Sequence, residues 1–159
     1  MKKVCVVGAG FVGLVTAAYL SDNGSKVIVV DSDSKKISRI RDKGKAPFFE
    51  KDLDKILIKN LNQSLFFTDN FEEALNESEI VFVCVGTPVL PSGKIDLQYI
   101  DLVSKQIGQY ISKSKDSKTV VIKSTVIPGT TSGIIKDNLE SFSGKSCGEG
   151  FDIVMNPEF

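Results

Sequence analysis

Residues 6–20, VVGAGFVGLVTAAYL, place Gly8, Gly10 and Gly13 in G-x-G-x-x-G spacing. An apolar, β-branched run precedes the glycines, and a stretch typical of a helix follows them. Glycines at these places allow a tight turn, a close backbone approach to a bound group, and close packing of the helix on the strand. The start of a helix offers N–H groups and a positive dipole end to a phosphate. The stretch therefore predicts a strand, a phosphate-binding turn and a helix.

A carboxylate follows this stretch at a characteristic distance. Asp31 ends the next apolar run, Val27–Val30, eighteen residues after Gly13. In the dinucleotide-binding fingerprint an acid at this place accepts hydrogen bonds from the adenosine ribose. Because it would also repel a 2′-phosphate, it predicts NAD rather than NADP. FAD proteins more often carry glutamate here and a Gly-Gly pair soon after, which the following residues SDSKKISRI lack. The structural alternative is a tight turn followed by a helix-capping aspartate.

Short apolar runs recur along the chain, with helical patterns between them. The runs are continuous rather than alternating, which is typical of parallel strands covered on both faces. We predict one α/β domain, residues 1–159, with a doubly wound, Rossmann-type parallel sheet of about six strands and helices on both faces. The predicted strands are Val4–Val7, Val27–Val30, Leu65–Phe67, Ile80–Val85, Val120–Ile122 and a buried Phe151–Met155. The predicted helices are a first one ending at Gly24, then Lys35–Lys43, Leu53–Asn60, Phe71–Asn76, one capped by Asp96, and Thr131–Leu139.

Composition excludes several classes of function. Lys+Arg and Asp+Glu both number 20, so there is no net charge to attract nucleic acid or an anionic membrane. The absence of histidine excludes histidine metal sites and serine–histidine triads within these residues, and we predict no metal site. Cys5, Cys84 and Cys147 lack metal-ligand spacing and suit a reducing cytoplasm. The basic, apolar start is also similar to a signal peptide, but its glycine spacing favours the phosphate turn.

Polar residues follow three of the predicted strands. Thr87 and Pro88 follow one strand, and Ser124 and Thr125 follow another. Because the carboxyl ends of parallel strands share one edge, these hydroxyls can bind ribose, phosphate or a substrate oxygen, although they can equally cap turns. Glu158 follows the last strand, where a carboxylate can exchange protons with a substrate hydroxyl. The alternative for Glu158 is a solvated loop acid.

Several separated segments together resemble the nucleotide-sugar 6-dehydrogenases, the family of UDP-glucose and GDP-mannose 6-dehydrogenases. The segments are GAGFVGLVTAAYL, VDSDSKKI, PFFEKDL, CVGTP, GKIDLQYI, KSTVIPGT and NPEF. The resemblance implies oxidation of a sugar C6 alcohol to a carboxylate with two NAD in succession. It also implies a cysteine nucleophile in a C-terminal half, to which none of the three cysteines here corresponds.

The resemblance also implies a role for each matching residue. Cofactor binding falls to Gly8, Ala9, Gly10, Phe11, Val12, Gly13, Asp31, Lys36, Thr87, Pro88, Ser124 and Thr125. Thr125 and Glu158 are the implied catalytic residues, and Glu158 and Phe159 are the implied substrate contacts. Many relatives have Pro-Gly where this chain has Lys51-Asp52, which weakens the assignment to a subfamily but not the fold.

Members of that family continue past NPEF into a dimer-forming helix and a second nucleotide-binding domain. We therefore expect this chain to be the N-terminal NAD-binding part of a longer, homodimeric or larger cytoplasmic enzyme, inactive by itself. The expected reaction converts UDP-glucose to UDP-glucuronate, and GDP-mannose or a UDP-N-acetylhexosamine is the alternative substrate. An alternative of another class is a stand-alone NAD-binding sensor module.

Overall fold

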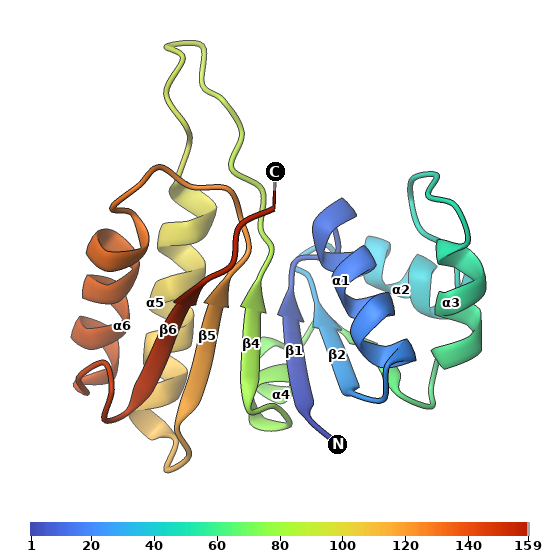
Figure 1. Cartoon of the computed structure of the whole chain (residues 1–159), viewed down its shortest axis with the longest axis horizontal. Coiled ribbons are helices and arrows are strands. Elements are labelled where there is room, and N and C mark those ends of the chain that lie inside the picture. Colours follow the sequence, from blue (N-terminus) through green and yellow to red (C-terminus); the bar gives the residue numbers. More distant parts are fainter. Residues whose placement is uncertain (159) are drawn as a thin grey trace.

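Six parallel strands form a single sheet in the order β3-β2-β1-β4-β5-β6 (Figure 1). The computed structural model describes residues 1–158. The order reverses between β1 and β4, where open α/β sheets bind their ligands. The strands are β1 (Lys3–Val7), β2 (Lys26–Val30), β3 (Leu65–Thr68), β4 (Ile80–Val83), β5 (Lys118–Ile122) and β6 (Phe151–Met155).

Helices cover the two faces of the sheet (Figure 1). The first three helices pack on one face, and the last three pack on the other. This arrangement confirms the predicted doubly wound fold. The helices are α1 (Phe11–Asp22), α2 (Ser34–Lys43), α3 (Leu53–Asn60), α4 (Phe71–Asn76), α5 (Gln98–Lys113) and α6 (Lys136–Ser143).

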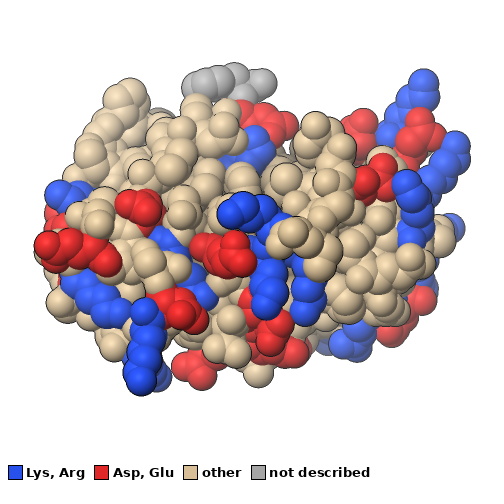
Figure 2. All heavy atoms as spheres, turned by 60° about the horizontal axis from the view of Figure 1, so that its bottom comes forward, with Lys and Arg blue, Asp and Glu red and all other residues tan. Residues whose placement is uncertain are grey.

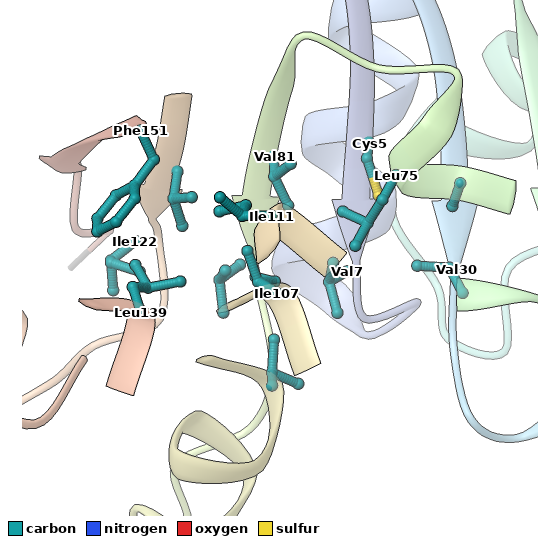
Figure 3. Close-up of a cluster of buried hydrophobic side chains, with 14 of the residues drawn as sticks. Cys5, Val7, Val30, Leu75, Val81, Ile107, Ile111, Ile122, Leu139 and Phe151 are labelled. Atoms are coloured by element: carbon teal, nitrogen blue, oxygen red, sulfur yellow. The ribbon is translucent and has the colours of Figure 1, made fainter. Parts of the chain in front are cut away.

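The strand β1 contributes alternate side chains to two hydrophobic cores. Val4 and Val6 pack with α1 to α3, whereas Cys5 and Val7 pack with α4 to α6. Figure 3 shows the second core, in which Ile107 of α5 lies near residues from β1, β4 and β5. Cys5 is fully buried and packs as a small core residue. Central strands buried on both sides explain why their sequences are continuously apolar.

The segment before α6 differs from its prediction. In place of one helix from Thr131 to Leu139, a π-helical turn spans Thr131–Ile135, and α6 then continues to Ser143. Gly133 lies at the kink with φ −102° and ψ −110°. The helix ends later than predicted because Gly144 adopts the left-handed conformation that closes a helix. Ser141 and Ser143 therefore belong to α6.

One strand end, one helix start and the burial of β6 also differ from the predictions. The strand β4 ends at Val83 rather than Val85. Helix α5 begins at Gln98, so Leu97 and not Asp96 occupies the N-cap position. The Asp96 carboxylate still accepts a hydrogen bond from the Gln98 N–H at 2.9 Å. The predicted burial of β6 is wrong at its end, since Val154 is 44% exposed. The reason is that β6 is an edge strand and one of its faces lacks a helix in the described part of the chain.

Charged side chains of both signs are interspersed on the face shown in Figure 2. This pattern accords with a chain in which 20 basic and 20 acidic residues balance. Among residues 1–158, no helix is both long enough and apolar enough to cross a membrane.

Candidate dinucleotide site

The glycine turn packs directly against β2 and β4. The Gly8 N–H donates to Val30 O at 2.8 Å, and Gly8 has φ 106°, a conformation that favours glycine. A Cβ at Gly8 would lie 2.7 Å from the Cys84 carbonyl oxygen, and one at Gly13 would lie 1.9 Å from the Gly8 carbonyl oxygen. Both glycines are therefore required by the packing of the turn itself.

Gly10 differs from its two neighbours in the motif. No described atom lies within 4 Å of the position that a Cβ at Gly10 would take. Gly10 precedes α1, and the first intrahelical hydrogen bond runs from Leu14 N to Gly10 O at 2.9 Å. The earlier N–H groups of α1, on Phe11, Val12 and Gly13, are thus available to an anion at the helix start. Open space beside these donors is what a bound pyrophosphate requires.

Asp31 joins the glycine turn to the start of α2. Its Oδ2 accepts hydrogen bonds from Ala9 N and Lys36 Nζ, each at 2.8 Å, and its Oδ1 accepts one from Asp33 N at 2.9 Å. Burial alone would raise the pKa of Asp31, but these hydrogen bonds outweigh burial and lower the pKa below its ordinary value. The structure therefore brings together Ala9, Asp31 and Lys36, three residues predicted to contact the cofactor, around an ionised carboxylate.

Asp31 should make the stability of the ligand-free chain depend on pH. Its folded-state pKa is lowered, so its contribution is fully present above the ordinary value of 3.8 and is lost as pH falls through the folded value. We expect wild type to exceed Asp31→Asn in unfolding free energy at pH 7, with the difference shrinking below about pH 4. Denaturant unfolding at pH 7, 5, 4 and 3 measures this. A difference that stayed constant or grew on acidification would contradict the assignment.

A pocket of about 390 Å³ lies beside the glycine turn and Asp31. Helix α5 closes its other side with Tyr99, Leu102 and Gln106, which we did not predict from the sequence. Tyr99 is 48% exposed and Leu102 is 53% exposed. Neither residue belongs to the buried stripe of α5. Two large apolar side chains outside that stripe are the sequence signal that could have predicted a contact with a ligand. The pocket joins donors for phosphate, an acceptor for ribose and an apolar wall suited to a base.

Two predicted residues at the glycine turn pack against the protein. The ring centroid of Phe11 lies 5.1 Å from that of Phe48 in the loop between α2 and α3. Val12 packs against the core beneath α1. Their backbone N–H groups can face a phosphate while their side chains hold the helix start in place.

The ends of β4, β5 and β6 are connected by hydroxyl hydrogen bonds. Thr87 Oγ1 donates to Thr125 O at 2.9 Å, and Thr125 Oγ1 donates to Glu158 O at 2.9 Å. Ser124 is buried and donates to Val85 O at 2.7 Å, so its hydroxyl serves the turn, as the structural alternative for this residue supposed. Pro88 is exposed, and its carbonyl closes the base of a projecting loop by accepting from Asp96 N at 2.8 Å (Figure 1).

Glu158 pairs with a lysine that the sequence analysis did not single out. Lys123 Nζ lies 2.9 Å from Glu158 Oε2. We call Thr87, Lys123, Thr125 and Glu158 the strand-end cluster. Phe159, the other predicted substrate contact, lies outside the described residues. Within the chain up to Glu158, no three His, Cys, Asp or Glu side chains are placed to hold a metal ion.

The predicted site residues thus form two groups at one edge of the sheet. The pocket residues Gly8, Gly10, Asp31 and Lys36 surround the space for a dinucleotide. The strand-end cluster lies across the switch point at the ends of β4 to β6. Both the pocket and the cluster border the carboxyl ends of the strands, where this fold class binds ligands.

The family model for the NAD binding domain of the UDP-glucose/GDP-mannose dehydrogenase family matches residues 2–159. The chain belongs to this family. The match confirms the resemblance seen in the sequence, and with the glycine turn and Asp31 it confirms NAD as the cofactor. Residues 2–159 therefore correspond to the NAD binding domain of this family, and the relatives that share it are NAD-dependent sugar dehydrogenases.

Individual members of the family are similar over the whole chain. GDP-mannose 6-dehydrogenase of Pseudomonas aeruginosa is 39% identical over 158 residues, which are 99% of this chain and 36% of the relative. UDP-glucose 6-dehydrogenase TuaD of Bacillus subtilis is 36% identical over 160 residues, which are 100% of this chain and 33% of the relative. The chain thus spans about a third of the length of these relatives.

Solved structures of the family have the same fold. The ternary complex of GDP-mannose dehydrogenase from Pseudomonas aeruginosa superposes with a TM-score of 0.95 at 39% identity, covering 99% of this chain and 36% of that one. The UDP-glucose dehydrogenase of Pyrobaculum islandicum superposes with a TM-score of 0.91 at 33% identity, covering 100% of this chain and 36% of that one.

In this NAD-binding domain, Gly10→Ala should weaken cofactor binding without unfolding the protein. The added methyl group meets no described atom, so the melting temperature should stay close to that of wild type. It enters the space beside the first N–H groups of α1, so NAD affinity should fall about tenfold or more, or roughly 1.4 kcal/mol. Calorimetric titration with NAD measures the loss. Wild-type affinity in a folded Gly10→Ala protein would show that the pyrophosphate does not lie there.

Proposed function

We propose that this chain binds NAD for a nucleotide-sugar 6-dehydrogenase that oxidises the sugar C6 alcohol to a carboxylate with two NAD in succession. The observation that carries this proposal is the placement of the strand-end cluster beside a dinucleotide pocket, at the same edge of the sheet. A pocket alone would suit any NAD-binding module. A carboxylate and hydroxyls across the switch point add groups that can act on a substrate alcohol.

The pocket residues bind and orient the cofactor. The N–H groups at the start of α1 bind the pyrophosphate, and Asp31 accepts hydrogen bonds from the adenosine ribose. Lys36 would add a positive charge at the cofactor while its Nζ holds the Asp31 carboxylate at 2.8 Å. When bound, the nicotinamide supplies the hydride acceptor for the sugar carbon. Thr87 and Thr125, whose hydroxyls donate to backbone carbonyls at the strand ends, lie on the side of the switch point where we place the substrate.

Glu158 has the proposed role of proton acceptor. Its carboxylate is 43% exposed at the end of β6, so a substrate hydroxyl or a water molecule can reach it. Thr125 holds the backbone of Glu158 at 2.9 Å and thereby fixes the start of the segment that contacts the sugar. We propose that Phe159 begins this segment.

Cys5 and Cys84 do not suit the covalent role that the family assigns to a thiol. Burial raises the pKa of Cys84 to about 12 and raises that of Cys5 still further, so both stay protonated at neutral pH. We propose that the nucleophile belongs to the part of the enzyme that residues 1–159 do not include. The 159-residue chain should accordingly bind NAD without oxidising a sugar.

The identity of the nucleotide sugar is a further part of this proposal. We propose UDP-glucose, giving UDP-glucuronate, as the substrate, and a similar protein, TuaD of Bacillus subtilis, is named UDP-glucose 6-dehydrogenase. GDP-mannose is the alternative substrate. The identity to GDP-mannose 6-dehydrogenase supports it, because it is 39% against 36% for TuaD. We also propose a homodimeric or larger assembly in the cytoplasm.

The test supplies the full-length protein with NAD and UDP-glucose, GDP-mannose or a UDP-N-acetylhexosamine, and counts the NADH formed per sugar consumed. Two NADH with one sugar would establish both the four-electron oxidation and the substrate. NAD binding without NADH from any nucleotide sugar would overturn the proposed function and favour a cofactor-sensing module.

A further inference from the structure

Lys123 directly follows β5, between the ends of its two neighbouring strands. Its N–H donates to Val83 O of β4 at 2.9 Å, and the carbonyl of the preceding residue, Ile122, accepts from Asn156 N at 2.9 Å. The sheet therefore fixes the backbone from which the Lys123 side chain starts. A lysine placed in this way has a defined reach, unlike one in a mobile loop.

The side chain of Lys123 is unusually buried for a lysine, with 14% of it exposed. Its Nζ lies 2.9 Å from Glu158 Oε2 and 3.4 Å from Asn156 Oδ1. The ammonium of a largely buried side chain is stabilised by oxygen partners, and the segment after β6 provides two. The charge of Lys123 is thus directed at the end of β6 rather than at solvent.

Glu158 is held at two points. Thr125 Oγ1 donates to its backbone carbonyl at 2.9 Å, and Lys123 contacts its carboxylate. The first contact places the residue but leaves three side-chain bonds free to rotate. The ion pair with Lys123 selects one orientation of the carboxylate, at the edge where the substrate is expected.

We propose that Lys123 is the positioning residue that orients the Glu158 carboxylate for proton transfer. This inference rests on the proposed function of Glu158. The location of the pair supports it: the Lys123 N–H donates to Val83 O at 2.9 Å, and the next residue, Cys84, lines the dinucleotide pocket. Both charges of the pair also act on the Cys84 thiol, since Lys123 lowers its pKa and Glu158, like burial, raises it. The ion pair therefore lies near the pocket wall. The alternative is a purely structural link between the ends of β5 and β6.

Steady-state kinetics of the full-length protein separate these two roles. In Lys123→Met we expect kcat to fall about 10- to 100-fold through misorientation of Glu158, with the KM for NAD unchanged. Lys123→Arg should recover most of kcat, because a guanidinium keeps the charge and reaches the same carboxylate. The matched control is Lys105→Met, which removes an ion pair of 2.7 Å to Asp101 on α5 and should keep wild-type kcat.

A double-mutant cycle with Glu158→Gln completes the test. If Lys123 acts through Glu158, Lys123→Met should cause no further loss of kcat in the Glu158→Gln background. Lys123→Gln, which keeps a hydrogen-bond donor but no charge, replaces Lys123→Met if the latter does not fold. Suppose that the wild type is active. If Lys123→Met then kept wild-type kcat, or lowered kcat as much in the Glu158→Gln background as in the wild-type background, this inference would be wrong and the proposed function would stand. A wild type that forms no NADH would overturn the proposed function together with it.

Discussion

Gly13→Ala should destabilise the domain more than Gly10→Ala or Asp31→Asn. The new Cβ would lie 1.9 Å from the Gly8 carbonyl oxygen and 3.0 Å from its carbon, both of them backbone atoms. No side-chain rotation relieves such a contact, so α1 must move away from the turn. We expect a loss of about 3 kcal/mol or more, or roughly 6–12 °C in melting temperature for a domain of this size.

Thermal unfolding of the 159-residue chain measures this effect, and Gly10→Ala is its matched control. The two substitutions add the same methyl group three residues apart in one motif, one against backbone and one in open space. A Gly13→Ala protein that melts like wild type would show that the helix does not pack on the turn as described.

Glu158→Gln in the full-length protein should lower kcat by about 10²- to 10⁴-fold, the usual contribution of a general base. The amide has nearly the shape of the carboxylate but cannot accept a proton. NAD affinity should be unchanged, because Glu158 lies outside the residues that line the dinucleotide pocket.

The measurement is NADH formation at saturating NAD and nucleotide sugar. Glu149→Gln is the control, since Glu149 is an exposed acid on the loop before β6. It therefore lies at the amino end of that strand, whereas Glu158 lies beyond its carboxyl end. If Glu158→Gln kept wild-type kcat, Glu158 would be a solvated loop acid and the proposed catalytic role would be wrong.

The cofactor half of the site was predictable because its chemistry is local. Gly8, Gly10 and Gly13 occur within six residues, and Asp31 directly follows the next strand. Short-range spacing of this kind can be recognised in the sequence without knowledge of tertiary contacts. The same holds for the central strands, whose burial on both faces makes them continuously apolar.

The rest of the site depends on contacts between distant segments. Lys123 gains its role only because β6 lies beside β5 and brings Glu158 within 2.9 Å, across 35 positions of sequence. Tyr99 and Leu102 line the pocket because of the way α5 lies across the sheet, which periodicity alone does not specify. Likewise, the exposure of Val154 follows from the edge position of β6 and not from its own apolar sequence.

The most direct test of the central claim is a calorimetric titration of the 159-residue chain with NAD and, separately, with NADP. We predict one NAD per chain and at least about tenfold weaker binding of NADP, because the Asp31 carboxylate would repel a 2′-phosphate. Asp31 is well placed for this discrimination, since its side chain is 12% exposed and fixed by Ala9 and Lys36. Binding of NADP as tightly as NAD, or no binding of NAD at all, would contradict the account.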